Sequence, residues 1–147
     1  DSADCAGKAN GHATTDISVE GNCLKLRRDR TKMTTICDLT EKTCVPCEGG
    51  VAPILRDEAL SMLESLEGWQ LSEDAKMISR RFEFKGFYRT MSFINAMAWV
   101  VNNENHHPDF SAGYNYCDVG FTTHAIDGLS ENDFICAAKV TALLGQL

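Results

Sequence analysis

Three of the four histidines in this chain, His106, His107 and His124, are confined to one short stretch of the sequence. Imidazole is the side chain best suited to give and take protons near neutral pH. Three of them around one cleft could therefore act as acid and base on a bound substrate. They could also be surface residues, or they could hold zinc with an open fourth position. Adjacent histidines diverge by about 100° on a helix and point to opposite faces of a strand, so we expect no shared metal ion.

A second group that could do chemistry is the pair Cys44-Val-Pro-Cys47, in a chain that has seven cysteines. CxxC pairs bind zinc or exchange disulfides. The sequence contains no second CxxC, and a structural metal would need Cys37 together with a fourth ligand from further upstream. We therefore interpret the pair as a turn bearing two free thiols. The odd cysteine count excludes a disulfide framework that uses all seven, and it favours a reducing intracellular compartment.

Helical and strand-like patterns begin at Pro53 and provide the elements that must position these groups. Apolar residues at helical spacing predict a first helix over about 55–67, which Gly68 ends. Two short strands, 69–71 and 77–84, follow around a polar turn. Apolar residues recur again from 87 to about 104 and predict a second helix across the sheet. We assign its buried stripe to Phe87, Met91, Ile94, Ala98 and Val101.

Alternation from 116 to 122 predicts one more strand, whose core face carries the odd-numbered residues. Ser130 then opens the last helix, with Asp133 as the acidic partner in a capping box. The order helix-strand-strand-helix-strand-helix predicts an α+β domain over 51–147, with helices packed on one face of a small antiparallel sheet. Residues 1–50 lack periodicity and are predicted to form an irregular N-terminal extension that contains the CxxC pair. A sheet this small has an unpaired edge, which a second subunit could cover.

Four motifs follow the second predicted helix in a fixed order: Asn105-His106-His107-Pro108-Asp109-Phe110, Tyr114-Asn115, Thr123-His124 and Gly128-Leu129-Ser130-Glu131-Asn132-Asp133. This order resembles the signature of the pterin-4a-carbinolamine dehydratases. Upstream, Gly68-Trp69, Arg80-x-Phe82-x-Phe84, Ala96-x-Ala98 and the lead-in Cys44-Val-Pro-Cys47-Glu-Gly-Gly are similar to the family as well. The resemblance covers about residues 38–147 and leaves residues 1–37 outside it.

The resemblance implies an enzyme, 4a-hydroxytetrahydrobiopterin dehydratase, that removes water from a hydroxylated tetrahydropterin without a cofactor. It implies that His106 is the acid at the departing hydroxyl, that His124 is its counterpart in proton transfer, and that His107 contacts the pterin ring. The substrate-binding residues that it implies are His107, Tyr114, Thr123 and Asp133. Asp133 would also orient an imidazole, beside or in place of its capping role. A homodimer or homotetramer is implied as well.

One position departs from the family pattern. Family members usually carry an acidic residue four positions before the first histidine of the pair, and this chain has Asn102 there. On a helix that position shares a face with His106, where a carboxylate would keep more of the imidazole protonated. The sequence therefore predicts that Asn102 either lowers activity or shifts its pH optimum downward, and that Asn102→Glu raises turnover at neutral pH.

Composition limits the partners. The formal net charge of −7 at pH 7 disfavours direct binding of nucleic acid through long-range attraction. The apolar runs are too short for a membrane-spanning helix. The first residue is Asp1, which indicates a processed form or a fragment. We expect a soluble intracellular protein of the cytoplasm, or of a plastid or mitochondrion after removal of a transit peptide.

A second function, from a different class, is a weakly catalytic or non-catalytic factor of the same fold that assembles or dimerises a partner protein. Asn102 and the long cysteine-bearing extension favour this function, whereas the intact set of three histidines favours the enzyme. The partner could dock on a helix surface or on the extension. The basic cluster at 25–32 in the extension could be a partner-docking patch or a transit-peptide remnant, but we interpret it as a solvated linker.

Overall fold

The computed structural model describes residues 17–20, 23–26, 36–46 and 52–145. The chain divides into two compact units, Asp1–Lys32 and Met33–Leu147. In the first unit, strands β1 (Ile17–Glu20) and β2 (Cys23–Leu26) pair as an antiparallel hairpin, where the sequence predicts irregular structure. Most of the basic cluster, from Arg27 onward, lies outside the described residues, as does Cys47 of the CxxC pair.

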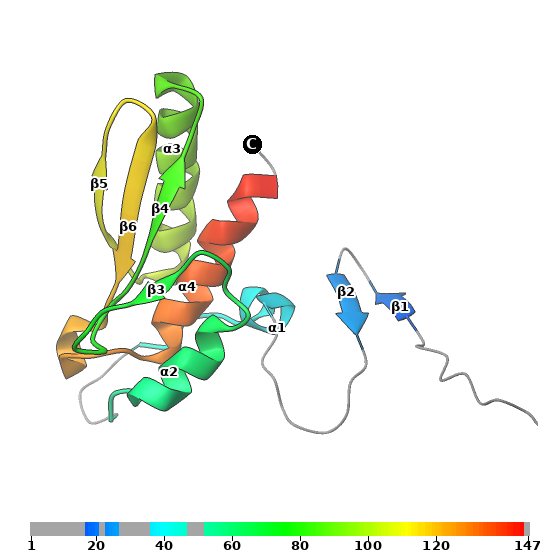
Figure 1. Cartoon of the computed structure of the whole chain (residues 1–147), viewed down its shortest axis with the longest axis vertical. Helices are drawn as coiled ribbons and strands as arrows, with labels where there is room; N and C mark the ends of the chain where they lie inside the picture. The colour runs from blue at the N-terminus through cyan, green and yellow to red at the C-terminus, as the bar shows by residue number, and fades with distance from the viewer. Residues whose placement is uncertain (1–16, 21–22, 27–35, 47–51, 146–147) are drawn as a thin grey trace, which may run out of the picture. The chain divides into compact units, whose positions relative to one another are not determined.

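The second unit is built on an antiparallel sheet of four strands (Figure 1). In spatial order its strands are β3 (Gln70–Leu71), β4 (Ile78–Glu83), β6 (Tyr116–Phe121) and β5 (Asp109–Ala112). Alternate residues of the two central strands are buried, as the sequence pattern predicts. These residues are Ile78 and Phe82 in β4 and Cys117, Val119 and Phe121 in β6. The intervening residues Ser79, Arg81 and Glu83 are exposed, so one face of the sheet meets solvent.

Helices cover the other face of this sheet. Helix α3 (Phe87–Glu104) and helix α4 (Glu131–Ala142) both contact β6 and each other, and Figure 1 shows them on the same side of the strands. Helix α2 (Arg56–Leu63) contacts β3, and two 3₁₀ turns, η1 (His124–Ile126) and η2 (Leu143–Gly145), flank α4. The α+β class, with helices on one face of a small antiparallel sheet, is confirmed. No helix in the described ranges is long and apolar enough to cross a membrane.

In the second unit, three further differences from the sequence prediction concern β5, α1 (Ile36–Glu41) and α3. Strand β5 is absent from that prediction because all four of its residues are exposed and show no alternation. Helix α1 lies in the predicted irregular extension, yet it packs against α4 and buries Leu39 completely. The predicted boundary of the domain near residue 50 remains a prediction.

The third difference concerns the buried face of α3. The buried residues are Thr90, Phe93, Met97 and Val101. Of the predicted stripe, Val101 is buried and Ile94 is half-buried against the core, whereas the other three positions are wrong. Phe87 and Met91 are 48% and 36% exposed, and Ala98 is exposed as well. The error arises because α3 is apolar on two sides, and periodicity alone does not identify which side meets the sheet.

Candidate active site

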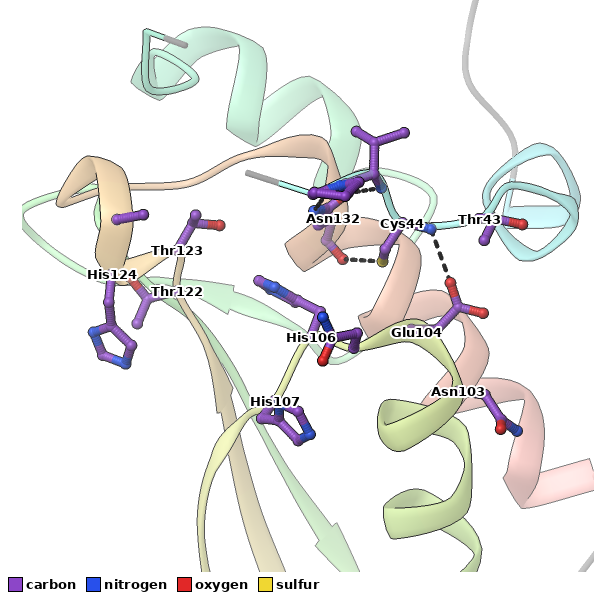
Figure 2. A pocket seen from close by; sticks show the side chains of 14 residues that line it. Thr43, Cys44, Asn103, Glu104, His106, His107, Thr122, Thr123, His124 and Asn132 are labelled. Atoms are coloured by element: carbon purple, nitrogen blue, oxygen red, sulfur yellow. Dashed lines mark hydrogen bonds between the residues drawn. The ribbon is translucent and has the colours of Figure 1, made fainter. Parts of the chain in front are cut away.

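The three histidines of the second unit line one pocket with a volume of about 580 Å³ (Figure 2). His106 and His107 follow the end of α3, and His124 opens the 3₁₀ turn after β6. The start of α4 and the segment Thr43–Pro46 complete the wall. The lining residues are Thr43, Cys44, Val45, Pro46, Asn103, Glu104, Asn105, His106, His107, Thr122, Thr123, His124, Ala125 and Asn132.

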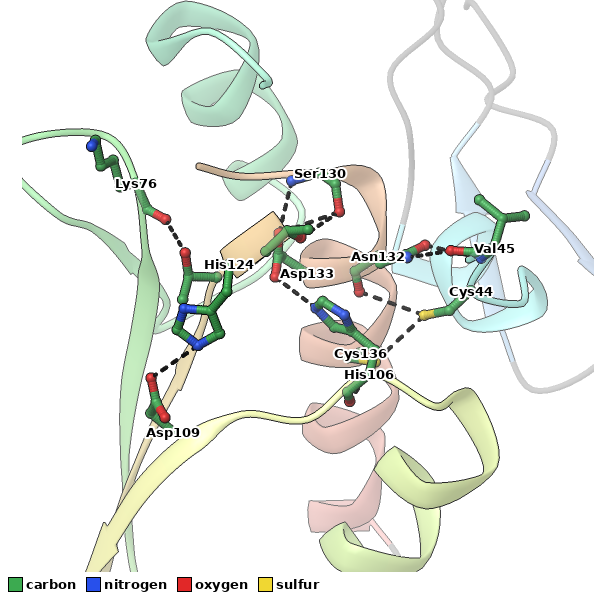
Figure 3. Close-up of polar contacts among 12 residues, drawn as sticks. Cys44, Val45, Lys76, His106, Asp109, His124, Ser130, Asn132, Asp133 and Cys136 are labelled. Carbon is green, nitrogen blue, oxygen red and sulfur yellow. Dashed lines mark hydrogen bonds and ion pairs between the residues drawn. The ribbon is translucent and has the colours of Figure 1, made fainter. Parts of the chain in front are cut away.

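His106 is held by a buried carboxylate. Its Nε2 lies 2.7 Å from Oδ1 of Asp133, the third residue of α4, and the His106 side chain is only 12% exposed (Figure 3). The imidazole also stacks on Phe121, with ring centroids 6.0 Å apart and planes 13° from parallel. Because the carboxylate accepts at Nε2, the neutral imidazole carries its proton there and keeps the lone pair of Nδ1. His106 is therefore fixed in both orientation and tautomer.

Asp133 reaches His106 with one oxygen and caps its own helix with the other. Its Oδ2 accepts a hydrogen bond from the backbone N–H of Ser130 at 2.7 Å. This contact is one half of the capping box that the sequence predicts, and both halves are present. The same oxygen accepts the hydroxyl of Thr123 at 2.8 Å. Thr123 lines the pocket, but its hydroxyl is directed to Asp133 and Ser130 rather than into the pocket. Capping and orientation of an imidazole thus coexist in one side chain.

His107 contacts Asn102, and the predicted pairing of Asn102 with His106 is wrong. Helix α3 ends at Glu104, and Asn105 adopts the left-handed conformation with φ 50°. The chain therefore leaves the helical repeat before His106, whose backbone N–H returns to the carbonyl of Val101. The Nε2 of His107 lies 3.2 Å from Oδ1 of Asn102 instead.

His124 is exposed, with 78% of its side chain accessible. Its Nε2 lies 3.8 Å from Oδ2 of Asp109, the first residue of β5, whose side chain is 67% exposed (Figure 3). An exposed imidazole exchanges protons readily with water. His124 and His106 thus offer the pocket one solvent-linked and one shielded proton carrier.

Tyr114, predicted to contact the substrate, does not line the pocket. It is 72% exposed in the turn between β5 and β6, where its ring stacks on Phe87 at a centroid distance of 6.2 Å. Figure 1 shows this turn at the opposite end of the strands from η1, which carries His124. Within one chain, therefore, the structure brings His106, His107, His124 and Thr123 together, and leaves Tyr114 apart.

An ion pair that the sequence analysis missed holds the wall formed by Thr43–Pro46. One carboxylate oxygen of Glu104 accepts a hydrogen bond from Lys139 Nζ at 2.5 Å, and the other accepts one from the backbone N–H of Cys44 at 2.8 Å. Burial alone would raise the pKa of Glu104, but the hydrogen bonds from Lys139 and Cys44 outweigh it and lower the pKa. Cys44, Glu104 and Lys139 are far apart in the sequence, so no local pattern predicts their contact. The only signal in the sequence for the segment Thr43–Pro46 was the motif Cys44-Val-Pro-Cys47.

The described side chains contain no group of three or more His, Cys, Asp or Glu residues placed to hold a metal ion. The oxygen atoms nearest each histidine belong to three different residues, Asp133, Asn102 and Asp109. The histidines therefore have separate partners, as suits three groups with separate roles.

The family model described as pterin 4 alpha carbinolamine dehydratase matches residues 52–143. A Nitrosomonas eutropha relative named after pterin-4-alpha-carbinolamine dehydratase is 60% identical over 113 residues, covering 76% of this chain and 98% of its own. A relative named likewise from Legionella pneumophila is 52% identical over 108 residues, or 73% of this chain and 96% of its own.

Among solved structures, the crystal structure of a transcriptional coactivator/pterin dehydratase from Brucella melitensis has the same fold, with a TM-score of 0.60 and 32% identity. The match covers 62% of this chain and 97% of that one. These relatives are bacterial, which gives the predicted plastid or mitochondrial location no support. The chain belongs to the pterin-4a-carbinolamine dehydratase family.

Proposed function

We propose that the chain dehydrates 4a-hydroxytetrahydropterin to quinonoid dihydropterin by histidine acid–base catalysis, without a cofactor. Membership of the family supports the reaction class. The observation that carries the proposal is the convergence of His106, His107 and His124 on one pocket, each beside a different oxygen partner.

The reaction requires two proton transfers. The C4a–O bond and the N5–H bond break, and a C4a=N5 double bond forms. The hydroxyl departs as water when an acid supplies a proton, and N5 loses its proton to a base. A positioned acid or base contributes roughly 10²–10⁴-fold to such a step. Because one proton is given and one is taken, the site recovers its starting state when a proton passes from the base back to the acid.

His106 suits the role of acid at the hydroxyl. When both of its nitrogens are protonated, Nε2–H is directed to Asp133 and Nδ1–H is available to the leaving oxygen. The buried carboxylate compensates the positive charge of that imidazolium, as in other sites where a carboxylate orients a catalytic histidine. The shielded position of His106, 12% exposed and stacked on Phe121, limits exchange of its proton with bulk water.

His124 is proposed as the counterpart that takes the proton from N5, and His107 as a contact to the pterin ring. The 78% exposure of His124 allows the proton to pass on to solvent. Asn102 holds His107 through an amide oxygen, which orients the imidazole without adding charge. Asp133 and Thr123 are proposed to act through His106 rather than by contact with substrate.

The test is the rate of 4a-hydroxytetrahydrobiopterin dehydration by the wild type, His106→Ala and His12→Ala. His12 is the fourth histidine and belongs to the other compact unit, so it controls for loss of an imidazole. We expect His106→Ala to lower kcat/KM by about 10²–10⁴-fold and His12→Ala to leave it unchanged. A wild-type rate no higher than the uncatalysed rate would reject the enzyme and favour an assembly function.

We also propose that two copies of the chain pair through β5. This strand is an edge of the sheet, all four of its residues are exposed, and Phe110 within it is 53% exposed. An uncovered edge presents unpaired backbone groups, and antiparallel pairing of two identical edges satisfies both at once. We expect Phe110→Lys to halve the mass measured by light scattering, while Trp99→Lys on α3 leaves it unchanged. The reverse pattern would place the interface on α3, where Trp99 is 70% exposed.

A further inference from the structure

Two thiols meet at the wall of the pocket. The sulfur of Cys44, in the segment Thr43–Pro46, lies 3.6 Å from the sulfur of Cys136 in α4 (Figure 3). Cys44 is half-buried and Cys136 is fully buried, and both are free thiols. A disulfide has an S–S distance of about 2.05 Å, so closing this pair requires a movement of roughly 1.5 Å.

The approach of the two thiols is enforced by neighbouring hydrogen bonds. Asn132 in the first turn of α4 accepts the backbone N–H of Val45 at 3.1 Å and donates to the Val45 carbonyl at 2.7 Å. Glu104 accepts the N–H of Cys44 at 2.8 Å. These contacts hold Val45 against α4 and Cys44 against the end of α3. Groups held together in this way react at a high effective concentration.

We propose that Cys44 and Cys136 form a reversible disulfide that links the segment Thr43–Pro46 to α4 and thereby controls the pocket. The oxidant is a small-molecule disulfide such as oxidised glutathione. The Cys44 thiolate attacks one glutathione sulfur and releases the first glutathione thiolate. The Cys136 thiolate then attacks the Cys44 sulfur, which releases the second. Two protein thiols are oxidised to one disulfide, one glutathione disulfide is reduced to two thiols, and the two protein protons end on the glutathione thiolates.

The order of attack follows from the surroundings of each sulfur. Cys44 is accessible, whereas Cys136 has no exposed surface. The hydrogen bond with Cys44, together with burial, strongly raises the pKa of Cys136, so its thiolate is scarce. Cys44 is therefore the attacking thiol and Cys136 the resolving one.

The link between this disulfide and catalysis rests on the proposed function. Cys44 and Val45 line the pocket, and the Cys136 thiol donates to the carbonyl of His106 at 3.8 Å. A disulfide has no S–H, so oxidation removes this donor and shifts the wall beside His106. We expect oxidation to lower kcat/KM by about two- to fivefold, the factor that corresponds to one weak hydrogen bond.

The experiment treats the reduced full-length chain with oxidised glutathione and maps its disulfides by mass spectrometry of peptides. We expect a Cys44–Cys136 linkage that dithiothreitol reverses, together with a rise in Tm of at least about 5 °C because the loop closed is long. Cys44→Ser and Cys136→Ala should abolish both changes. Cys117→Ala is the matched control, because Cys117 is an equally buried thiol without a sulfur partner in the described chain, and it should retain both.

Two results overturn the proposal: all thiols remaining free after treatment, or Cys44 linked to Cys47 instead of Cys136. An unchanged kcat/KM after full conversion to the Cys44–Cys136 disulfide overturns control of the pocket. Peptide mapping and Tm require no substrate. A protein that forms the disulfide but never dehydrates the pterin would therefore refute the proposed function and leave the disulfide established.

Discussion

Replacing Asp133 with asparagine separates the two tasks of this side chain. The Oδ2 atom accepts from the Ser130 N–H and the Thr123 hydroxyl, and Oδ1 accepts from His106. Asparagine has one acceptor oxygen, which we expect on the side of Ser130 and Thr123 because two donors lie there. Its NH₂ group then faces Nε2 of His106 and donates to it. The imidazole proton must move to Nδ1, which is the wrong tautomer for the proposed acid.

The size of the effect follows from these contacts. In this variant the neutral His106 carries its proton on Nδ1 instead of Nε2, and no carboxylate stabilises its charged form. His106 then no longer acts as a positioned acid, so we expect kcat to fall by about 10²–10⁴-fold. The helix cap and a hydrogen bond to His106 survive, but none of these contacts now involves a charged carboxylate. We expect the free energy of unfolding to fall by roughly 1.5–3 kcal/mol. Asp133→Ala removes every acceptor from a fully buried site, and its cost should be higher, about 3–5 kcal/mol.

The assay combines dehydration kinetics, urea denaturation and ¹⁵N NMR of the histidine ring nitrogens. Glu131→Gln is the matched control, because it makes the same carboxylate-to-amide change in the first turn of the same helix. Glu131 is 52% exposed and pairs with Lys42 on the surface, so its loss should leave kcat unchanged and cost less than about 1 kcal/mol. An Asp133→Asn protein that keeps both wild-type kcat and the Nε2–H tautomer of His106 would refute the reasoning.

Three further outcomes are expected. Asn102→Glu places a charge beside His107 rather than His106, so it should change KM more than kcat, and an unaltered KM would contradict the contact. Burial opposes ionisation of Glu104, but the hydrogen bonds from Lys139 and Cys44 outweigh it and lower the pKa of this carboxyl in the folded state. The ionised carboxylate therefore stabilises the fold fully above its unfolded pKa of about 4.3. This stability is lost as the pH falls through the lower folded pKa. Urea denaturation should therefore show a shallower loss of stability below about pH 4.3 in Glu104→Gln than in the wild type. Burial raises the pKa of Cys117 to about 11, so iodoacetamide at about pH 8 should leave this thiol unmodified in native protein, as peptide masses will show.

The elements with clear periodicity could be predicted from the sequence. Alternation placed Cys117, Val119 and Phe121 on the core face of β6, and the bounds of α3 follow from its repeating apolar residues. The capping box identified Ser130 and Asp133 at the start of α4. These patterns lie within single elements, and they predict the structure because each helix or strand must bury one face.

The rest depends on contacts between distant segments. Helix α1 has only six residues, and its packing against α4 buries Leu39, which no local pattern reveals. Strand β5 has no buried residue and so lacks the alternation that marks a strand. The sequence predicts the end of this helix near residue 104 but not the left-handed turn at Asn105, although asparagine is common at such a position. His106 was therefore placed on the same face as Asn102, whose partner is His107.

The left-handed turn at Asn105 has a consequence for how this protein could evolve or be redesigned. On a continuous helix the two adjacent imidazoles would both project from α3, about 100° apart, but the left-handed turn sends His106 toward α4 and returns His107 to α3. A β-branched residue at 105 would disfavour the positive φ and displace both rings together. Substitution at a position that does no chemistry of its own would thus disturb two functional groups at once, whereas glycine there would preserve both.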